Sequence, residues 1–188
     1  TRVIDQAARQ CNEQRATIAI SGETKQAVAN FIEERLLYMA DQMGVTRNAL
    51  DAALAADVER PLHRQIDIAR LLSGFAESEA GQAVAAANKR IVNILKKSGA
   101  EEHGVTAHLF EHGAEKHLFA ALVKAENAID PGNPEQSLAL LATLREPVDR
   151  FFDDVMVMAE DEALRHNRLA LLTRLRQLFL RLADVSRL

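Results

Sequence analysis

Cationic and amide side chains recur at helical spacing within residues 82–99. At about 100° per residue, Lys89, Asn93 and Lys96 fall on one side of such a helix. Arg90 lies beside them. Lysine and arginine neutralise phosphates, and asparagine forms hydrogen bonds with base edges. This side therefore predicts a surface that binds nucleic acid. The alternative is a solvated helix face whose lysines favour the C-terminal end of the helix dipole.

Arginine dominates the last segment of the chain. Residues 163–188 hold six arginines against a single acid, Asp184, so the net charge of this segment is +5 although that of the whole chain is −4. A cationic segment on an acidic chain predicts a nucleic-acid or acidic partner. A solvated helix face is again the alternative interpretation.

Helical spacing sorts the side chains of this last segment into faces. A leucine stripe that predicts bundle packing comprises Leu164, Leu171, Leu175, Leu178 and Leu182. Arg165, Arg176 and Arg187 are spaced by eleven residues, or three helical turns, so we expect them to share one edge. Arg168 lies close to the leucine stripe and, if buried, needs a carboxylate partner, for which an acid of residues 155–162 is a candidate. We assign Arg168 a structural role.

Histidine, cysteine and glycine indicate little chemistry in this chain. Four of the six histidines lie between residues 103 and 117, and His108 and His112 have the spacing of metal ligands on a helix. Gly113 interrupts that helix and no third ligand follows at a proper spacing, so we predict a polar loop and no metal site. Cys11 is the only cysteine, which excludes an internal disulfide. Because no phosphate-binding glycine loop or nucleophile–base pair is visible, the segment is predicted to be non-catalytic.

The composition favours helices. Eight glycines and four prolines in 188 residues argue against a turn-rich β protein, and the commonest residues are good helix formers. No strand-like alternation and no repeat of fixed period is visible. We therefore predict an all-α fold, a helical bundle. The chain shows no signal peptide and no apolar run long enough for a membrane span, and we expect a cytoplasmic location.

Capping and turn residues predict where several helices begin and end. Ser21 or Thr24 is expected to start a helix that Gly44 ends, along which apolar residues recur at helical spacing. Pro61 fits the first turn of a later helix. The strongest turn signal, at residues 130–134, separates two further helices.

A shift in composition at residues 73–81 is the best internal boundary. We place a smaller helical segment at residues 1–75 and the main helical bundle at residues 76–188.

Several stretches of the chain together resemble one protein family. They are FIEERLLYMADQMG, ALDAALA, ANKRIVNIL, SLALLATLREPVDRFFDDVMVM and DEALRHNRLALLTRLRQLFLRLADVSRL. Spread between Phe31 and Leu188, they resemble the C-terminal region of the β subunit of bacterial tetrameric glycyl-tRNA synthetase. In that family this region is a helical anticodon-binding domain of the DALR type, akin to that of arginyl-tRNA synthetase.

The resemblance implies a substrate, a partner and a division of labour. It implies that this region binds glycine tRNA as part of a glycine–tRNA ligase and is itself non-catalytic. An α subunit would hold the site for glycine activation in an α2β2 assembly. ATP and magnesium would act at that distant site, and no cofactor is expected in this region.

The resemblance also singles out individual positions. The strongest matches to the family's motifs are Asn88, Lys89, Arg90, Asn93, Arg165, Asn167 and Arg168. Asn88 falls on or near the apolar side of its helix, where a buried amide must find hydrogen-bond partners. From the motifs and the charge pattern together, the predicted tRNA-binding residues are Asn88, Lys89, Arg90, Asn93, Lys96, Arg165 and Arg176.

Base reading follows from the same substrate. Glycine codons begin with GG, so the matching anticodons carry two cytosines. Carboxylates accept hydrogen bonds from cytosine N4. Asp153, Asp154 and Glu160 are therefore the candidate base-reading acids, although each also has a helix-capping interpretation.

Two other functions remain open at this point. The region could serve as a helical scaffold that docks on other domains or on the α subunit with little RNA contact, which predicts a contiguous exposed apolar patch. It could also be the anticodon-binding domain of another synthetase, such as the arginyl enzyme.

Overall fold

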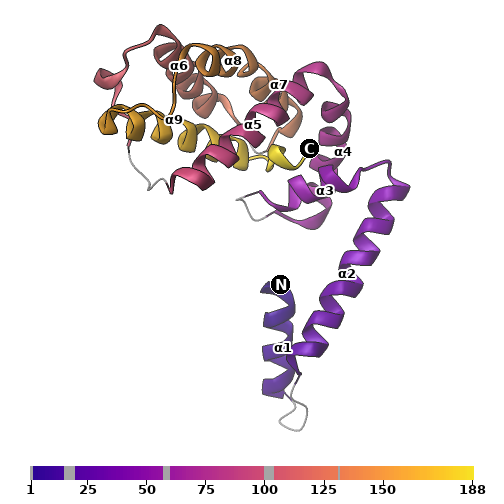
Figure 1. Ribbon diagram of the computed structural model, residues 1–188. Helices are drawn as coiled ribbons and strands as arrows, with labels where there is room; N and C mark the ends of the chain where they lie inside the picture. The colour runs from indigo at the N-terminus through magenta and orange to yellow at the C-terminus, as the bar shows by residue number, and fades with distance from the viewer. Residues whose placement is uncertain (1, 15–19, 57–59, 100–103, 131) are drawn as a thin grey trace. The chain divides into compact units, whose positions relative to one another are not determined.

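The computed structural model describes residues 2–14, 20–56, 60–99, 104–130 and 132–188 (Figure 1). Throughout these ranges the regular elements are helices, and no strand occurs. The all-α prediction is confirmed. The chain divides into two compact units, residues 1–44 and residues 45–188.

The first unit consists of α1 (Arg2–Gln14) and α2 (Gly22–Gln42). Ser21 caps α2, because its Oγ accepts a hydrogen bond from the N–H of Thr24 at 3.1 Å. The Lys25 ammonium bonds Asp5 at 3.1 Å and so joins the two helices. Gly44 follows α2 with a φ of 69°, a conformation that glycine adopts freely. The predicted start at Ser21 and end at Gly44 are both confirmed.

Large apolar side chains of α2 lie on the surface. Those exposed are Val28, Phe31, Ile32, Tyr38, Met39 and Met43. At 100° per residue they fall within one arc of the helix, which we call the α2 apolar face. On α2 only Leu36 and Ala40 are buried, so these two helices gain little of the stabilisation that apolar burial provides.

The second unit is a bundle of helices joined by short connections. Its elements are α3 (Arg47–Leu54), α4 (Leu62–Glu77), α5 (Glu79–Ser98), the 3₁₀ turn η1 (Ala107–Leu109), α6 (Gly113–Ala128), α7 (Pro134–Ala142), α8 (Arg145–Asp154), α9 (Glu162–Leu180) and the 3₁₀ turn η2 (Val185–Arg187). Helix α5 packs against α4, α8, α9 and η2, so it lies at the centre of this unit (Figure 1).

Leucine fills most of the core of the second unit. Fully buried side chains include Leu72 of α4, Ile91 of α5, Leu118 and Leu122 of α6, Phe151 of α8, and Leu171, Leu175 and Leu178 of α9. The last three belong to the predicted leucine stripe, and Leu182, beyond the end of α9, is also buried, whereas Leu164 is half-buried. The stripe therefore builds the bundle from Leu171 onward.

A single residue, Ser78, separates α4 from α5. Its Oγ donates to the carbonyl of Phe75 at 2.7 Å and accepts from the N–H of Gly81 at 3.0 Å. A Cβ added at Gly81 would lie 1.8 Å from the Phe75 carbonyl oxygen, so only glycine lets the two helices approach this closely. The predicted domain boundary falls at this junction, whereas the compact units divide after residue 44. The functional division near residue 75 stays a prediction.

Helix α9 ends before the last predicted arginine. The N–H of Arg181 bonds the carbonyl of Leu178 and that of Leu182 bonds Phe179, which turns the chain out of the helix. The N–H of Asp184 then donates to the carbonyl of Ala52 at 2.9 Å and fastens the turn to α3. Arg187 lies in η2, so the prediction of one helical edge through Arg165, Arg176 and Arg187 was wrong at its last member.

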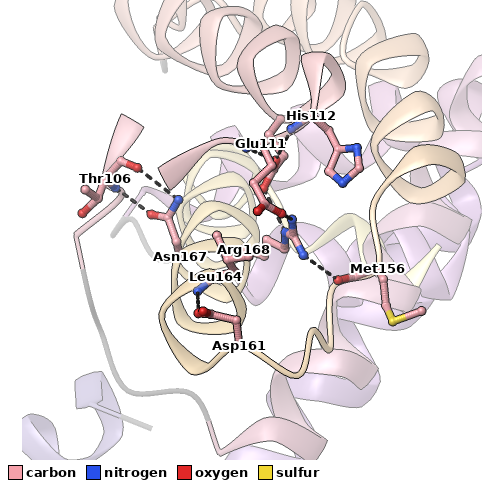
Figure 2. A network of polar contacts seen from close by, with 9 residues as sticks. Thr106, Glu111, His112, Met156, Asp161, Leu164, Asn167 and Arg168 are labelled. Atoms are coloured by element: carbon pink, nitrogen blue, oxygen red, sulfur yellow. Dashed lines mark hydrogen bonds and ion pairs between the residues drawn. The ribbon is translucent and has the colours of Figure 1, made fainter. Parts of the chain in front are cut away.

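Arg168 of α9 lies inside a cluster of oxygen acceptors (Figure 2). Its Nε donates to Glu115 Oε1 at 2.9 Å, and the side chains of Arg168 and Glu115 are 4% and 1% exposed. Its two terminal nitrogens donate to Glu111 Oε2 and to the Met156 carbonyl, both at 3.1 Å. We call Glu111, Glu115, Met156 and Arg168 the Arg168 cluster. It holds α6, α9 and the α8–α9 connection together.

The partner of Arg168 differs from the prediction. The expected carboxylate lay in residues 155–162, but that stretch contributes only the Met156 carbonyl, and the acids come from the start of α6. Glu115 is the stronger partner because it is fully buried, and its second oxygen accepts the N–H groups of Glu111 and His112 at 2.9 and 2.8 Å. Spacing placed Arg168 near the core, but it carried no information on which helix would face it.

The buried pair generates a stability prediction. Glu115→Gln removes the charge that neutralises Arg168 in the core, and breaking a buried pair typically costs about 3–5 kcal/mol. We expect a loss of that order in the free energy of unfolding, measured by urea denaturation.

A matched control uses an exposed pair of the same unit. Glu146→Gln removes the ion-pair partner of Arg150. The side chains of Glu146 and Arg150 are 74% and 59% exposed, and exposed pairs contribute about 0–1 kcal/mol. Equal losses for the two variants would show that Arg168 does not depend on Glu115.

Candidate nucleic-acid interface

The predicted cationic side of α5 lies on the surface of the second unit. Lys89, Arg90, Asn93 and Lys96 are all exposed. Ser78 caps the start of this helix, and Gly99 ends it with a φ of 58°. The opposite side of the helix is buried, which fixes the direction in which the cations point. We call these four exposed residues the α5 cationic face.

Asn88 does not belong to this face. Its side chain is 3% exposed, and its amide nitrogen donates to the Val84 carbonyl at 3.2 Å. It lies beside Ile91 on the packed side of α5. In this fold Asn88 therefore positions α5 and does not present its amide at the surface, so we leave it out of the proposed interface.

Arg90 stacks on Phe152 of α8. The guanidinium carbon lies 4.1 Å from the centroid of the phenyl ring, within the range of a cation–π contact. Phe152 is half-buried, and its ring meets the fully buried Phe151 edge-on, with centroids 5.6 Å apart. Sequence reasoning missed Phe152. The available signal was two adjacent phenylalanines on an amphipathic helix, of which only one can face the core.

The cations of the α5 cationic face keep their charges unpaired. Lys89, Arg90 and Lys96 form no ion pair with any residue in the described ranges. Such a group retains its full attraction for an external phosphate, because no internal carboxylate competes for it.

The arginines of α9 are mostly committed to contacts inside the protein. Arg165 donates to the carbonyls of Ala159 at 2.9 Å and Glu160 at 3.3 Å. Arg174 forms two hydrogen bonds with Glu126 at 2.7 and 2.6 Å, and this bonding raises the pKa of Arg174.

Of the remaining arginines, Arg181 donates to the Glu126 carbonyl at 3.3 Å, and Arg187 pairs with Asp184. Burial acts to raise the pKa of Asp184, but hydrogen bonds from Ser186 and Arg187, together with the charges of Arg187 and Arg176, lower it below its ordinary value. The Nε of Arg176 is buried and has no hydrogen-bond partner among the described residues. Arg165 and Arg176 thus lie on α9 as predicted, but neither offers the open charge that α5 does.

The three candidate base-reading acids occupy two places. Asp153 and Asp154 are exposed at the last turn of α8, directly after Phe152, and pair with no cation in the described part of the chain. Glu160 is exposed in the α8–α9 connection. Asp161 is the residue that caps α9, because its Oδ1 accepts from the N–H of Leu164 at 3.0 Å. The capping interpretation therefore does not explain Asp153 or Asp154, which lie at the unfavourable, negative end of their helix dipole.

Asn167 serves the fold. Its side chain is 4% exposed; its oxygen accepts the N–H of Thr106 at 2.7 Å and its nitrogen donates to the Thr106 carbonyl at 3.1 Å (Figure 2). This pair of bonds fastens the segment around η1 to α9.

Other chemistry finds no support in the described residues. No three histidine, cysteine or acidic side chains among them gather with the geometry of a metal site. Part of the histidine-rich stretch, His103, lies outside the described residues. None of the described helices combines the length and hydropathy that crossing a membrane requires.

Curated relatives match most of the chain. The glycine–tRNA ligase beta subunit of Marinobacter nauticus is 40% identical over 180 residues, which cover 93% of this chain and 26% of that protein. The subunit of the same name from Acidovorax ebreus is 44% identical over 172 residues, which cover 88% and 24%. That of Vibrio parahaemolyticus is 41% identical over 167 residues, which cover 86% and 24%. The chain spans about a quarter of the length of these relatives.

A family model described as the DALR anticodon binding domain matches residues 84–184. This range runs from the first buried valine of α5 to the acid that begins η2, and it contains the α5 cationic face, Phe152 and the Arg168 cluster. The matched range is more than half of the chain. The chain belongs to the DALR anticodon binding domain family.

Proposed function

We propose that this chain binds the anticodon arm of a glycine tRNA through the α5 cationic face. The observation that carries the proposal is the set of unpaired cations on α5, beside the Arg90–Phe152 stack and inside the range of the family match. Lys89, Arg90 and Lys96 would neutralise phosphates, and Asn93 would donate or accept at a base or sugar. Neutralising phosphates releases counterions, so the affinity falls as salt rises.

The acids at the end of α8 supply the proposed base reading. Single-stranded RNA loops are read by hydrogen bonds to the edges of unstacked bases. Asp153 and Asp154 are exposed, unpaired within the described residues and adjacent in sequence to the ring that holds Arg90. Their carboxylates accept from cytosine N4. Glu160 is a more remote candidate in the α8–α9 connection.

The wider role follows from the names of the relatives. Within a longer β subunit, the chain would support ATP-dependent glycylation of glycine tRNA as part of a glycine–tRNA ligase. An α subunit would be the partner that holds the site for glycine activation, with its ATP and magnesium, in the cytoplasm. This chain itself would remain non-catalytic and position the tRNA.

A charge-reversal pair tests the α5 cationic face. Lys89→Glu with Lys96→Glu should weaken binding of glycine tRNA by more than about tenfold at low salt. It should also reduce the slope of log affinity against log salt by about 1 to 2, because each lost phosphate contact removes about 0.7–0.9. Fluorescence anisotropy across a salt series measures both quantities.

Two further pairs complete this experiment. Arg64→Glu with Arg70→Glu changes the net charge equally at exposed positions of α4 and should leave the affinity within about twofold. Arg165→Glu with Arg176→Glu should lower stability, because both side chains are engaged or partly buried. Unchanged affinity for the α5 pair, or an equal loss for the α4 pair, would contradict the assignment.

Base reading is tested by changing both partners. Replacing either anticodon cytosine by uracil removes the N4 donor and should weaken binding about 5- to 100-fold, since such contacts discriminate by about 1–3 kcal/mol. Asp153→Ala with Asp154→Ala should abolish the difference between cytosine and uracil, whereas Glu135→Ala, at an exposed acid of α7, should preserve it. Arginine tRNA serves as the non-cognate RNA, and tighter binding of it would favour an arginyl-type domain. The same preference for cytosine in the double alanine variant would show that other groups read the base.

The α2 apolar face favours a second role for residues 1–44. Six large apolar side chains on one arc exceed what isolated surface residues would show, and such patches mark interaction sites. The relatives are about four times as long as this chain, so much polypeptide is available to cover the face. We propose that another part of the longer β-subunit chain packs on it.

Polar substitutions on α2 test this second role in the longer polypeptide. Phe31→Ser with Met39→Ser should lower the melting temperature of the longer protein by several degrees, because buried apolar area is lost on docking. Gln26→Ser with Glu33→Ser, on the opposite side of α2, should leave it unchanged. Equal melting temperatures for the two variants would show that the face stays in solvent.

A further inference from the structure

We infer that one unstacked base of the anticodon loop stacks on the Arg90–Phe152 pair. The inference rests on the proposed function and adds to it a stacking site that involves one residue outside the predicted set. The base would stack on the face of the guanidinium that Phe152 does not occupy.

The contact with Phe152 holds the exposed Arg90 guanidinium in place. The Arg90 guanidinium is planar, lies 4.1 Å from the ring centroid of Phe152 and belongs to an exposed residue. Phe152 is itself held by the edge of Phe151, whose side chain is fully buried. An otherwise mobile arginine is therefore anchored to the core through two rings, which reduces the conformational entropy lost on binding.

The hydrogen-bond donors of Arg90 remain available. No acceptor or carboxylate among the described residues engages its guanidinium. The second arginine–aromatic pair of this unit behaves differently: Arg174 lies 5.3 Å from the ring of Phe119, but Glu126 takes its donors at 2.7 and 2.6 Å. Arg174 is thus a structural contact, whereas Arg90 combines an open plane with unused donors.

The neighbours of the stack favour RNA over a protein partner. Lys89 and Asn93 are exposed near Arg90 on α5, and the exposed Asp153 follows Phe152 on α8, so a cation, an amide and a carboxylate are sequence neighbours of the contacting pair. An acidic peptide would use the cations but not the plane. A nucleotide uses all of them, because its phosphate meets lysine, its ring stacks on the guanidinium and its edge meets polar groups.

Conservative variants separate the plane from the charge. Arg90→Lys keeps the charge but loses the plane, and Phe152→Leu keeps apolar volume but loses the ring. The probe is the anticodon stem-loop of glycine tRNA, intact or with one loop nucleotide at a time made abasic. Each variant should bind the intact RNA about tenfold more weakly, in line with the stacking of one base on a planar side chain, with an unchanged salt slope.

The abasic RNAs identify the stacked base. At one loop position, removal of the base should weaken binding by the original chain about tenfold and should make Arg90→Lys indistinguishable from it, since the lost contact is then the same. Phe152→Tyr retains a ring and should keep the original affinity, which shows that a loss with Phe152→Leu is not a folding defect. Arg70→Lys, at an exposed position of α4, is the control for replacing an arginine.

Three results would overturn the inference. If Arg90→Lys binds the intact stem-loop as the original chain does, while Lys89→Glu with Lys96→Glu loses binding, the α5 cationic face binds RNA but no base stacks on Arg90. If Arg90→Lys loses the same factor on every abasic RNA, or weakens binding of a polyglutamate peptide equally, the guanidinium does not act by stacking on a loop base. If the original chain does not bind the stem-loop, the proposed function fails together with the inference.

Discussion

The charge of Arg168 must be neutralised inside the bundle, and the second unit is arranged around that requirement. Glu115 supplies the buried counter-charge from the first turn of α6, and the Met156 carbonyl supplies an acceptor from the connection between α8 and α9. The pair leaves little freedom in the register of α9 against α6, because a shift of one turn would strand two charges in an apolar interior. The end of α8, with Phe152 and the two acids that follow it, is positioned by the same contacts.

Cations in this protein divide into two sets with different tasks. Arg165, Arg168 and Arg174 of α9 bind carbonyls and carboxylates of their own chain, so most of the basic side chains of that helix hold the bundle together. Those of the α5 cationic face are unpaired within the described residues, and one of them, Arg90, contacts an aromatic ring. Local charge density is therefore a poor guide to an RNA-binding surface here, since what matters is the charge left after internal pairing.

Much of the fold could be predicted from local sequence, and much of the candidate site could not. The start of α2 at Ser21, its end at Gly44 and the leucine stripe depend on spacings of a few residues, which the chain displays directly. The Arg90–Phe152 contact joins residues far apart in sequence, and no periodic pattern encodes it. Arg165 shows the same limit, because helical spacing gave its direction but not the carbonyls that capture its guanidinium. The membership of the family was accessible from five stretches, and helical spacing already placed Asn88 on or near the apolar side of α5, where it is buried.

The close junction at Gly81 connects the position of α5 to that of α4. Ser78 is the only residue between α4 and α5, and Gly81 lets the Phe75 carbonyl approach the start of α5 closely. The junction between the two helices is therefore short and tightly packed. Helix α4 packs in turn on α3, to whose Ala52 carbonyl the chain after α9 is fastened. The one-residue junction thus links the position of α5 to that of α4, and through α4 to α3.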